Sequence, residues 1–134
     1  MNEAILYTLN MLKRRSVVIL ISDFIDEGYY HNLKGLARRH DLVIIRVTDK
    51  RETQLPKLGL VPVLDKESSK TLWINTSFGG FRNKIKNMAS DNFQELSKFS
   101  KRNQVNFVNI DTNEDYVPKL LKLFKVRNKS FKSV

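Results

Sequence analysis

One unbroken apolar run, residues 17–21, constrains the fold more than any other stretch of the sequence. It reads VVILI, is rich in β-branched residues and shows no alternation of polar and apolar side chains. The run is far too short to cross a bilayer, and its pattern is typical of a strand buried on both faces of a helix-covered parallel sheet. We therefore expect an α/β fold with residues 17–22 as a core strand.

Two further strands are expected, at residues 42–47 and 105–110. A short helix that ends near His40 joins the first two strands, and a long helix that begins after Thr76 or Ser77 precedes the last. Short links between strand and helix favour right-handed crossovers and parallel pairing. We therefore predict a single three-layer α/β domain over residues 1–134, with a mostly parallel, Rossmann-like sheet and a first helix near residues 4–12.

A β-hairpin is expected where residues 60–64 and 71–75 flank a polar turn. Pro62 lacks a backbone N–H and is confined to an edge strand or a bulge. We therefore place this hairpin at one edge of the sheet.

The charge balance favours acidic partners in general. Lys and Arg number 24 against 14 Asp and Glu, which gives a net charge of +10. Such a balance suits nucleic acid, anionic lipid or an acidic protein surface. Cysteine is absent, so disulfides and thiolate metal sites are excluded and a reducing compartment fits. The sequence has no apolar run of about 18 residues and no signal-peptide pattern, and we expect a cytoplasmic protein.

The sharpest chemical feature is the carboxylate that ends the first strand. Ser22 and Asp23 stand at its carboxyl end, where open α/β sheets bind ligands, and Asp26 lies in the turn that follows. Asp23 is either a metal ligand or a cap of this turn. One carboxylate cannot supply the octahedral oxygen shell of Mg²⁺, so capping is favoured and we expect no measurable Mg²⁺ binding by the chain alone.

No catalytic constellation accompanies that carboxylate. Ser22 has no general base at a fixed offset, and the sequence holds no cofactor fingerprint. We therefore expect a binding module with no cofactor rather than an enzyme.

Basic residues recur in the closing helix and tail. No acid follows Asp115, and the solvated face of a terminal helix is the plainer interpretation; an anionic-lipid or nucleic-acid patch is the alternative. Aromatic interleaving and a recognisable nucleic-acid module are absent, so specific nucleic-acid binding is not expected. The residues of this basic patch are Lys119, Lys122, Lys125, Arg127, Lys129 and Lys132.

An ordered set of short motifs runs through the chain. It comprises RRSVVILISDF at residues 14–24, RHD at 39–41, Asp49 and Glu52 before Leu55, Pro56 and Gly59, Asp65 and Glu67 before the hairpin turn, and Leu120, Leu121 and Arg127 near the end. This set resembles the von Willebrand factor A-like domains and, more closely, a bacterial family of them, number fifty-eight among the domains of unknown function.

The resemblance implies protein–protein interaction rather than catalysis. Members of that family are usually encoded beside MoxR-type AAA+ ATPases, so such an ATPase is the implied partner. Their upstream half carries an Asp-x-Ser-x-Ser motif that completes a metal-ion-dependent adhesion site. This motif is absent here and Asp23 is the position that carries over, so the adhesion site is incomplete and Mg²⁺ is implied only if the upstream half is supplied.

The same resemblance implies a missing neighbour for residues 17–21. In von Willebrand A-like sheets the corresponding strand lies beside the first strand, which belongs to the upstream half. We therefore expect one side of this strand to be unpaired, and the isolated chain to self-associate through it or to bind the missing half. The alternative function is a basic module for nucleic acid or an anionic membrane surface. Salt dependence separates the two, because counterion release weakens polyanion binding steeply.

Overall fold

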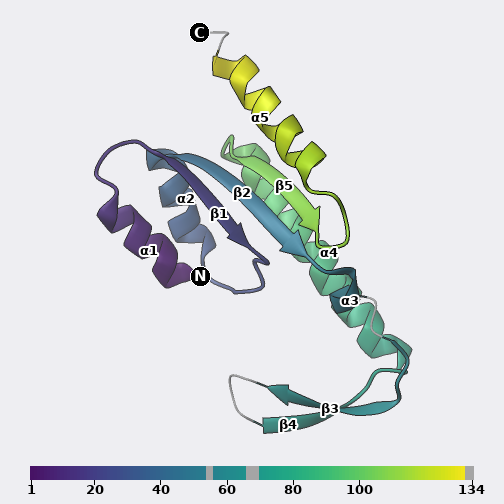
Figure 1. Cartoon of the computed structure of the whole chain (residues 1–134). Coiled ribbons are helices and arrows are strands. Elements are labelled where there is room, and N and C mark those ends of the chain that lie inside the picture. The colour runs from purple at the N-terminus through teal and green to yellow at the C-terminus, as the bar shows by residue number, and fades with distance from the viewer. Residues whose placement is uncertain (54–55, 66–69, 132–134) are drawn as a thin grey trace.

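A three-stranded parallel sheet forms the centre of the computed structural model, which describes residues 1–53, 56–65 and 70–131. The strands lie in the order β1 (Val17–Ser22), β2 (Asp41–Thr48) and β5 (Asn106–Asp111), as Figure 1 shows. β2 pairs in parallel with both neighbours. The predicted mixed α/β fold with a parallel sheet is confirmed, and each expected strand agrees with an observed one to within a residue.

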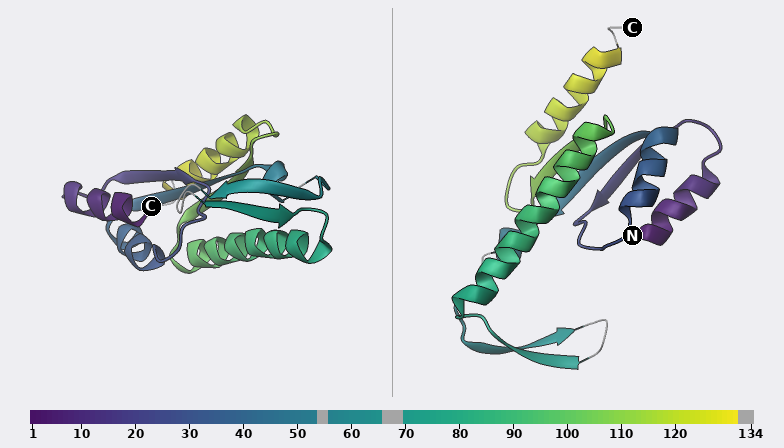
Figure 2. Two further views of the ribbon diagram at one scale, coloured as in Figure 1. Left: turned by 90° about the horizontal axis from the view of Figure 1, so that it is seen from below. Right: turned by 180° about the vertical axis from the view of Figure 1, so that it is seen from behind.

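Helices cover the two faces of this sheet unequally. α1, α2 and α4 lie on one face, while α5 lies on the other and covers only its β2–β5 side (Figure 2). A single turn of helix, α3, follows β2. The helices are α1 (Asn2–Met11), α2 (Tyr30–Arg39), α3 (Lys50–Thr53), α4 (Gly79–Arg102) and α5 (Val117–Phe131).

Alternation along β2 divides the core in two. Leu42 and Ile44 point to the α2–α4 face, where they pack with Leu33 of α2 and Leu96 of α4. Val43 and Ile45 point to the opposite face and pack beneath α5. β2 is buried on both sides from Leu42 to Arg46, which is typical of a central strand in a helix-covered parallel sheet.

The β-hairpin does not join the main sheet. β3 (Leu60–Asp65) and β4 (Lys70–Asn75) pair with each other only, and they form a separate antiparallel ribbon at the amino-terminal end of α4 (Figure 1). The prediction of a hairpin at the sheet edge is therefore wrong in its placement. Pro62 is tolerated because both strands of a two-stranded ribbon are edges, and it lies opposite Trp73.

Hydrogen bonds close the base of the ribbon, between the residues that precede β3 and the residue that follows β4. Thr76 donates its backbone N–H to the carbonyl of Gly59 at 2.9 Å, and its hydroxyl accepts from the N–H of Leu58 at 3.0 Å. Gly59 itself has φ +74°, a conformation that glycine adopts without a steric penalty. The ribbon carries apolar side chains on both faces, and Trp73 is 69% exposed.

None of the helices, within the ranges that the structure describes, combines the length and the hydropathy that a membrane crossing requires.

Candidate functional site

β1 has an open edge. It hydrogen-bonds to β2 along its full length, from Val17 opposite Asp41 to Ser22 opposite Arg46. On its other side no strand pairs with it, within the part of the chain that the structure describes. The predicted absence of a neighbour is therefore confirmed, and a row of backbone N–H and C=O groups faces outward.

One face of β1 is exposed as well. Val17, Ile19 and Ile21 point to the α5 side of the sheet and are 59%, 44% and 66% exposed. α5 packs its Leu120 and Leu123 on the neighbouring part of that face and leaves β1 uncovered (Figure 2). The open edge and these three side chains form one surface, which we call the β1 surface.

The opposite face of β1 is covered by the first helix. Ile5 of α1 is fully buried and packs with Val18, and Leu9 joins the rim of the same core. α1 approaches α2 closely at Gly35, where an added Cβ would lie 3.7 Å from Leu9 Cδ1. The expectation that residues 17–21 are buried on both faces is therefore half wrong, because the described residues supply a covering helix on one face only.

Asp23 caps the turn at the carboxyl end of β1. Its Oδ1 accepts from the N–H of Ile25 at 3.3 Å and from the hydroxyl of Ser22 at 3.2 Å. The Ser22 hydroxyl in turn accepts from the N–H of Phe24 at 3.2 Å. Asp26 lies further along and forms an ion pair with the amino group of Met1 at 2.5 Å. These contacts are those expected of a capping carboxylate.

The turn holds one residue in a strained conformation. Phe24 has φ +59°, which is uncommon for a residue other than glycine, and its side chain is fully buried. The Asn92 side-chain amide of α4 donates to the Phe24 carbonyl at 2.6 Å. Burial of the ring and this bond from α4 together offset the strain, so the turn is fixed to the core.

The residues at this end of the sheet do not fit a magnesium site. Among the described residues, no group of three or more His, Asp or Glu side chains is placed to hold a metal ion. Mg²⁺ needs an octahedral set of oxygen ligands, and Asp23 is already used in the turn. Absence of Mg²⁺ binding by the chain remains a prediction.

Asp49, at the end of β2, is held by its neighbour. The Arg51 guanidinium binds both oxygens of this carboxylate at 2.7–3.1 Å, and the Arg51 backbone N–H adds a bond of 2.8 Å. The Arg51 side chain, and then its backbone N–H, lower the pKa of Asp49 to about 2. The same pair raises the pKa of Arg51. This carboxylate therefore stays ionised and ordered at the start of α3.

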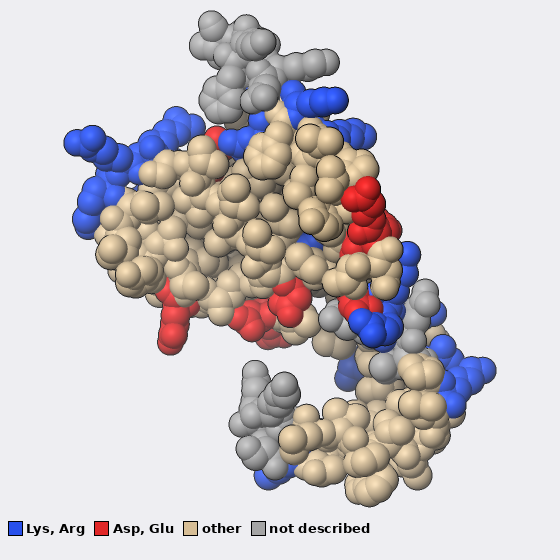
Figure 3. All heavy atoms as spheres, in the orientation of Figure 1, with Lys and Arg blue, Asp and Glu red and all other residues tan. Residues whose placement is uncertain are grey.

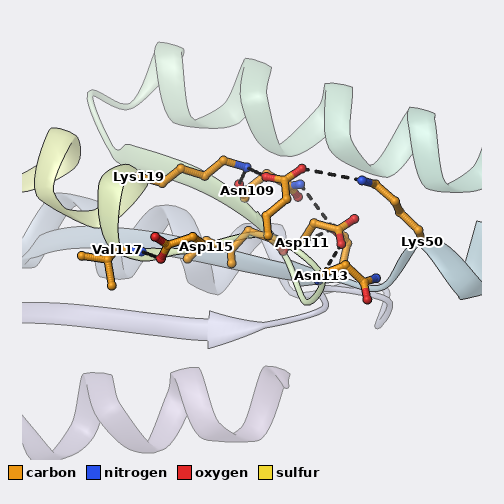
Figure 4. Close-up of polar contacts among 10 residues, drawn as sticks. Lys50, Asn109, Asp111, Asn113, Asp115, Val117 and Lys119 are labelled. Atoms are coloured by element: carbon orange, nitrogen blue, oxygen red, sulfur yellow. Dashed lines mark hydrogen bonds and ion pairs between the residues drawn. The ribbon is translucent and has the colours of Figure 1, made fainter.

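The β5–α5 connection uses part of the basic patch (Figure 4). Lys119 donates to the Asn109 carbonyl at 3.1 Å and to Glu114 at 2.5 Å, while Lys50 approaches the other oxygen of Glu114 at 3.9 Å. Asp111 and Asp115 accept from backbone N–H groups of the same connection. Lys119 therefore fixes the entry into α5.

The other residues of the predicted basic patch differ in their surroundings. Arg127 is buried and forms an ion pair with Asp41 at the start of β2. Lys122 and Lys125 are exposed. The side chain of Lys129, and Lys132 altogether, lie outside the described residues.

Sequence reasoning missed a different basic surface, a groove of about 950 Å³ between α2 and α4. Its walls carry Lys34 and Arg38 on α2, and Lys98 and Arg102 on α4. The signal was present in the sequence as two basic pairs at a spacing of four residues, each on one face of a helix.

The buried Tyr29 hydroxyl makes the stability of the fold depend on pH. Burial, and then the adjacent Tyr30 hydroxyl, raise the pKa of Tyr29 well above its ordinary value of 10.0. Only the unfolded chain then loses this proton as the pH rises past about 10, so the stability that Tyr29 contributes is complete below that pH and declines above it. We expect Tyr29→Phe to lose less stability than the parent between pH 9 and 11, as measured by urea unfolding at each pH. Equal losses in the two proteins would contradict this assignment.

A family model described as "Protein of unknown function DUF58" matches residues 1–95. The chain belongs to this family. The matched range contains β1, β2, the hairpin and the first part of α4. It therefore includes all of the β1 surface.

Curated relatives of this DUF58 chain come from mycobacteria and are named without a function. Uncharacterized protein Mb1516 of Mycobacterium bovis and Uncharacterized protein Rv1480 of Mycobacterium tuberculosis are each 37% identical over 57 residues, 42% of this chain and 18% of theirs. Uncharacterized protein MAV169 of Mycobacterium avium is 35% identical over 60 residues, 44% of this chain and 36% of its own. The match spans well under half the length of these relatives. No solved structure matches the chain.

Proposed function

We propose that this DUF58 chain is a non-enzymatic interaction module that accepts a strand from another polypeptide along β1. The observation that carries the proposal is the β1 surface, where an unpaired strand edge adjoins three exposed apolar side chains. An added strand would hydrogen-bond to the outward backbone groups of β1, and its attached chain would cover Val17, Ile19 and Ile21. This is recognition by strand addition, in which the main chain provides affinity and the side chains provide specificity.

Covering the β1 surface with an added strand is energetically favourable. Burying the exposed parts of three β-branched side chains stabilises a complex by roughly 1 kcal/mol each. Charged side chains or proline usually protect an edge strand from pairing, and β1 carries neither between Val17 and Ser22. The basic residues of the preceding loop flank the strand without interrupting it.

We consider two sources for the added strand. One is the upstream half that von Willebrand A-like domains carry, and the other is a second copy of this chain. We further propose that the assembled module acts with a MoxR-type AAA+ ATPase. This partnership is supported by the ordered motifs of the chain, which resemble those of a family usually encoded beside such ATPases. Binding to nucleic acid or an anionic membrane stays the alternative, and it differs by a steep loss of affinity with salt.

The proposal predicts self-association of the isolated chain. We expect dimers or larger species in light scattering at micromolar concentration, and we expect Ile19→Lys to shift the population toward monomer, because a buried lysine charge is costly. Met88→Lys is the matched control, since Met88 is an exposed apolar residue of α4 on the other side of the sheet. A monomeric parent protein with a cooperative thermal transition would exclude a second copy of this chain as the source of the strand, and equal effects of the two substitutions would refute pairing through β1.

A further inference from the structure

The groove between α2 and α4 is a strongly cationic surface with an ordered arrangement. Lys34 and Arg38 are four residues apart on α2, as are Lys98 and Arg102 on α4. Four residues correspond to about 6 Å along a helix and to the same side of it. All four side chains are exposed and line the same groove, with α2 and α4 on one face of the sheet (Figure 2).

These four cations have no compensating partner within the described residues. None of them takes part in an ion pair there. Glu95 also lines the groove, so acidic side chains are outnumbered. Like charges four residues apart destabilise a helix, and a negatively charged ligand in the groove would relieve the repulsion within both pairs.

The floor of the groove is apolar. It is formed by Tyr30 and Ala37 of α2 and by Phe99 of α4, which pack against the main core. The rings of Tyr30 and Phe99 are 5.6 Å apart, and Tyr30 stacks on Tyr29 at 4.6 Å. These rings contact each other and are not free platforms for stacking nucleobases, which is the usual anchor of single-stranded nucleic acid.

We propose that this groove binds an acidic amphipathic helix of a partner protein. Apolar side chains of that helix would lie on the floor, and carboxylates on its two flanks would pair with the cations of α2 and α4. This is the helix-in-groove mode of recognition, with charge complementarity selecting the partner. The site is separate from the β1 surface and does not depend on strand addition.

The test uses the full chain and a designed probe. The probe is a fluorescein-labelled peptide of about 18 residues, roughly five helical turns, with leucines on one face and glutamates on both flanks. The matched control peptide has glutamine in place of every glutamate. Fluorescence anisotropy should show binding of the acidic peptide below about 0.1 mM, and the neutral peptide should bind at least about tenfold more weakly.

Paired variants locate the binding. Arg38→Ala with Arg102→Ala should weaken binding of the acidic peptide by about tenfold. Lys122→Ala with Lys125→Ala removes the same charge from the exposed side of α5 and should change affinity by less than about twofold. The groove variant loses the repulsion between like charges but also loses cations from the last turns of α2 and α4, where they are favoured, so its thermal midpoint should stay close to that of the parent protein.

Three results would overturn the proposal. Equal weakening by the groove pair and the α5 pair would show attraction to net charge alone. Equal affinity for the acidic and neutral peptides would show a merely apolar contact. Tighter binding of a single-stranded oligothymidylate than of the acidic peptide, lost in the groove variant, would assign the groove to nucleic acid. Failure of the light-scattering test on β1 would leave these outcomes unchanged.

Discussion

Replacing Arg127 with alanine is expected to lower the free energy of unfolding by about 3 kcal/mol. The side chain of Arg127 is 8% exposed, and that of its partner Asp41 is 26% exposed. The ion pair connects α5 to the start of β2 across 86 residues of sequence. Removing the arginine leaves a partly buried carboxylate without its counter-charge, which costs more than the pair itself contributes.

Urea unfolding of matched variants measures this cost. Arg51→Ala is the control, because it breaks an ion pair at the surface, where the Arg51 side chain is 85% exposed. Surface pairs contribute little, so this control should lose far less stability than Arg127→Ala. Asp41→Asn should fall between the two, since it removes the charge and keeps the shape. Equal losses for Arg127→Ala and Arg51→Ala would show that α5 does not depend on this pair.

Replacing Phe24 with alanine is expected to cost about 3–5 kcal/mol. Its ring is fully buried, lies 5.9 Å from the ring of Tyr29, and belongs to the larger core. Alanine and phenylalanine bear the same backbone strain at φ +59°, so the difference reports the lost ring and the cavity it leaves.

The next residue provides the control for this substitution. Ile25 is 68% exposed, and Ile25→Ala should change stability by less than about 0.5 kcal/mol. Thermal or urea unfolding of the two variants compares them directly. A small effect of Phe24→Ala would mean that the turn after β1 is not anchored through its ring.

The sequence located β1 and β2 well because each contains a continuous apolar run, whereas β5 alternates short apolar stretches with Asn106, Asn109 and Asp111. It could not say which runs are covered on both faces. β1 and β2 have similar apolar patterns, yet β2 lies between two strands and two helix layers, while β1 lies at an edge and is covered by helices on one face only. Coverage depends on where other elements pack, and a local pattern does not contain that information. The hairpin shows the same limit, because the sequence predicts its two strands but not their position relative to the main sheet.

The regular spacing of basic residues in the closing helix does not show which of them form ion pairs. Lys119 and Arg127 share the basic pattern of the closing helix, but each has a tertiary partner, Glu114 and Asp41 respectively. The contact with Asp41 is remote in sequence and was not foreseeable from α5. By contrast, the groove pairs such as Lys34 and Arg38 were visible as like charges at helical spacing. To predict the groove from these pairs, one needs only to know that α2 and α4 lie side by side on the sheet.

A large asymmetry of charge accompanies these sites. Figure 3 shows acidic side chains gathered on the side of the sheet domain that faces the hairpin, with basic side chains at the opposite end and a second basic group around the start of α4. The basic end contains the groove on α2 and α4, where the last turns of both helices carry arginines or lysines. Such a separation orients the molecule in the field of a charged partner and favours a specific approach.

Hydrogen exchange along β1 tests the central claim most directly. In a monomer, the N–H groups on the open edge of Val17–Ser22 face solvent and should exchange fast, while those of β2 are protected on both sides. If β1 accepts a strand, its outward amides should become protected as the protein concentration rises, and Ile19→Lys should abolish that increase. Amides of β1 that exchange at one unchanged rate across the concentration range, in both proteins, would contradict the account.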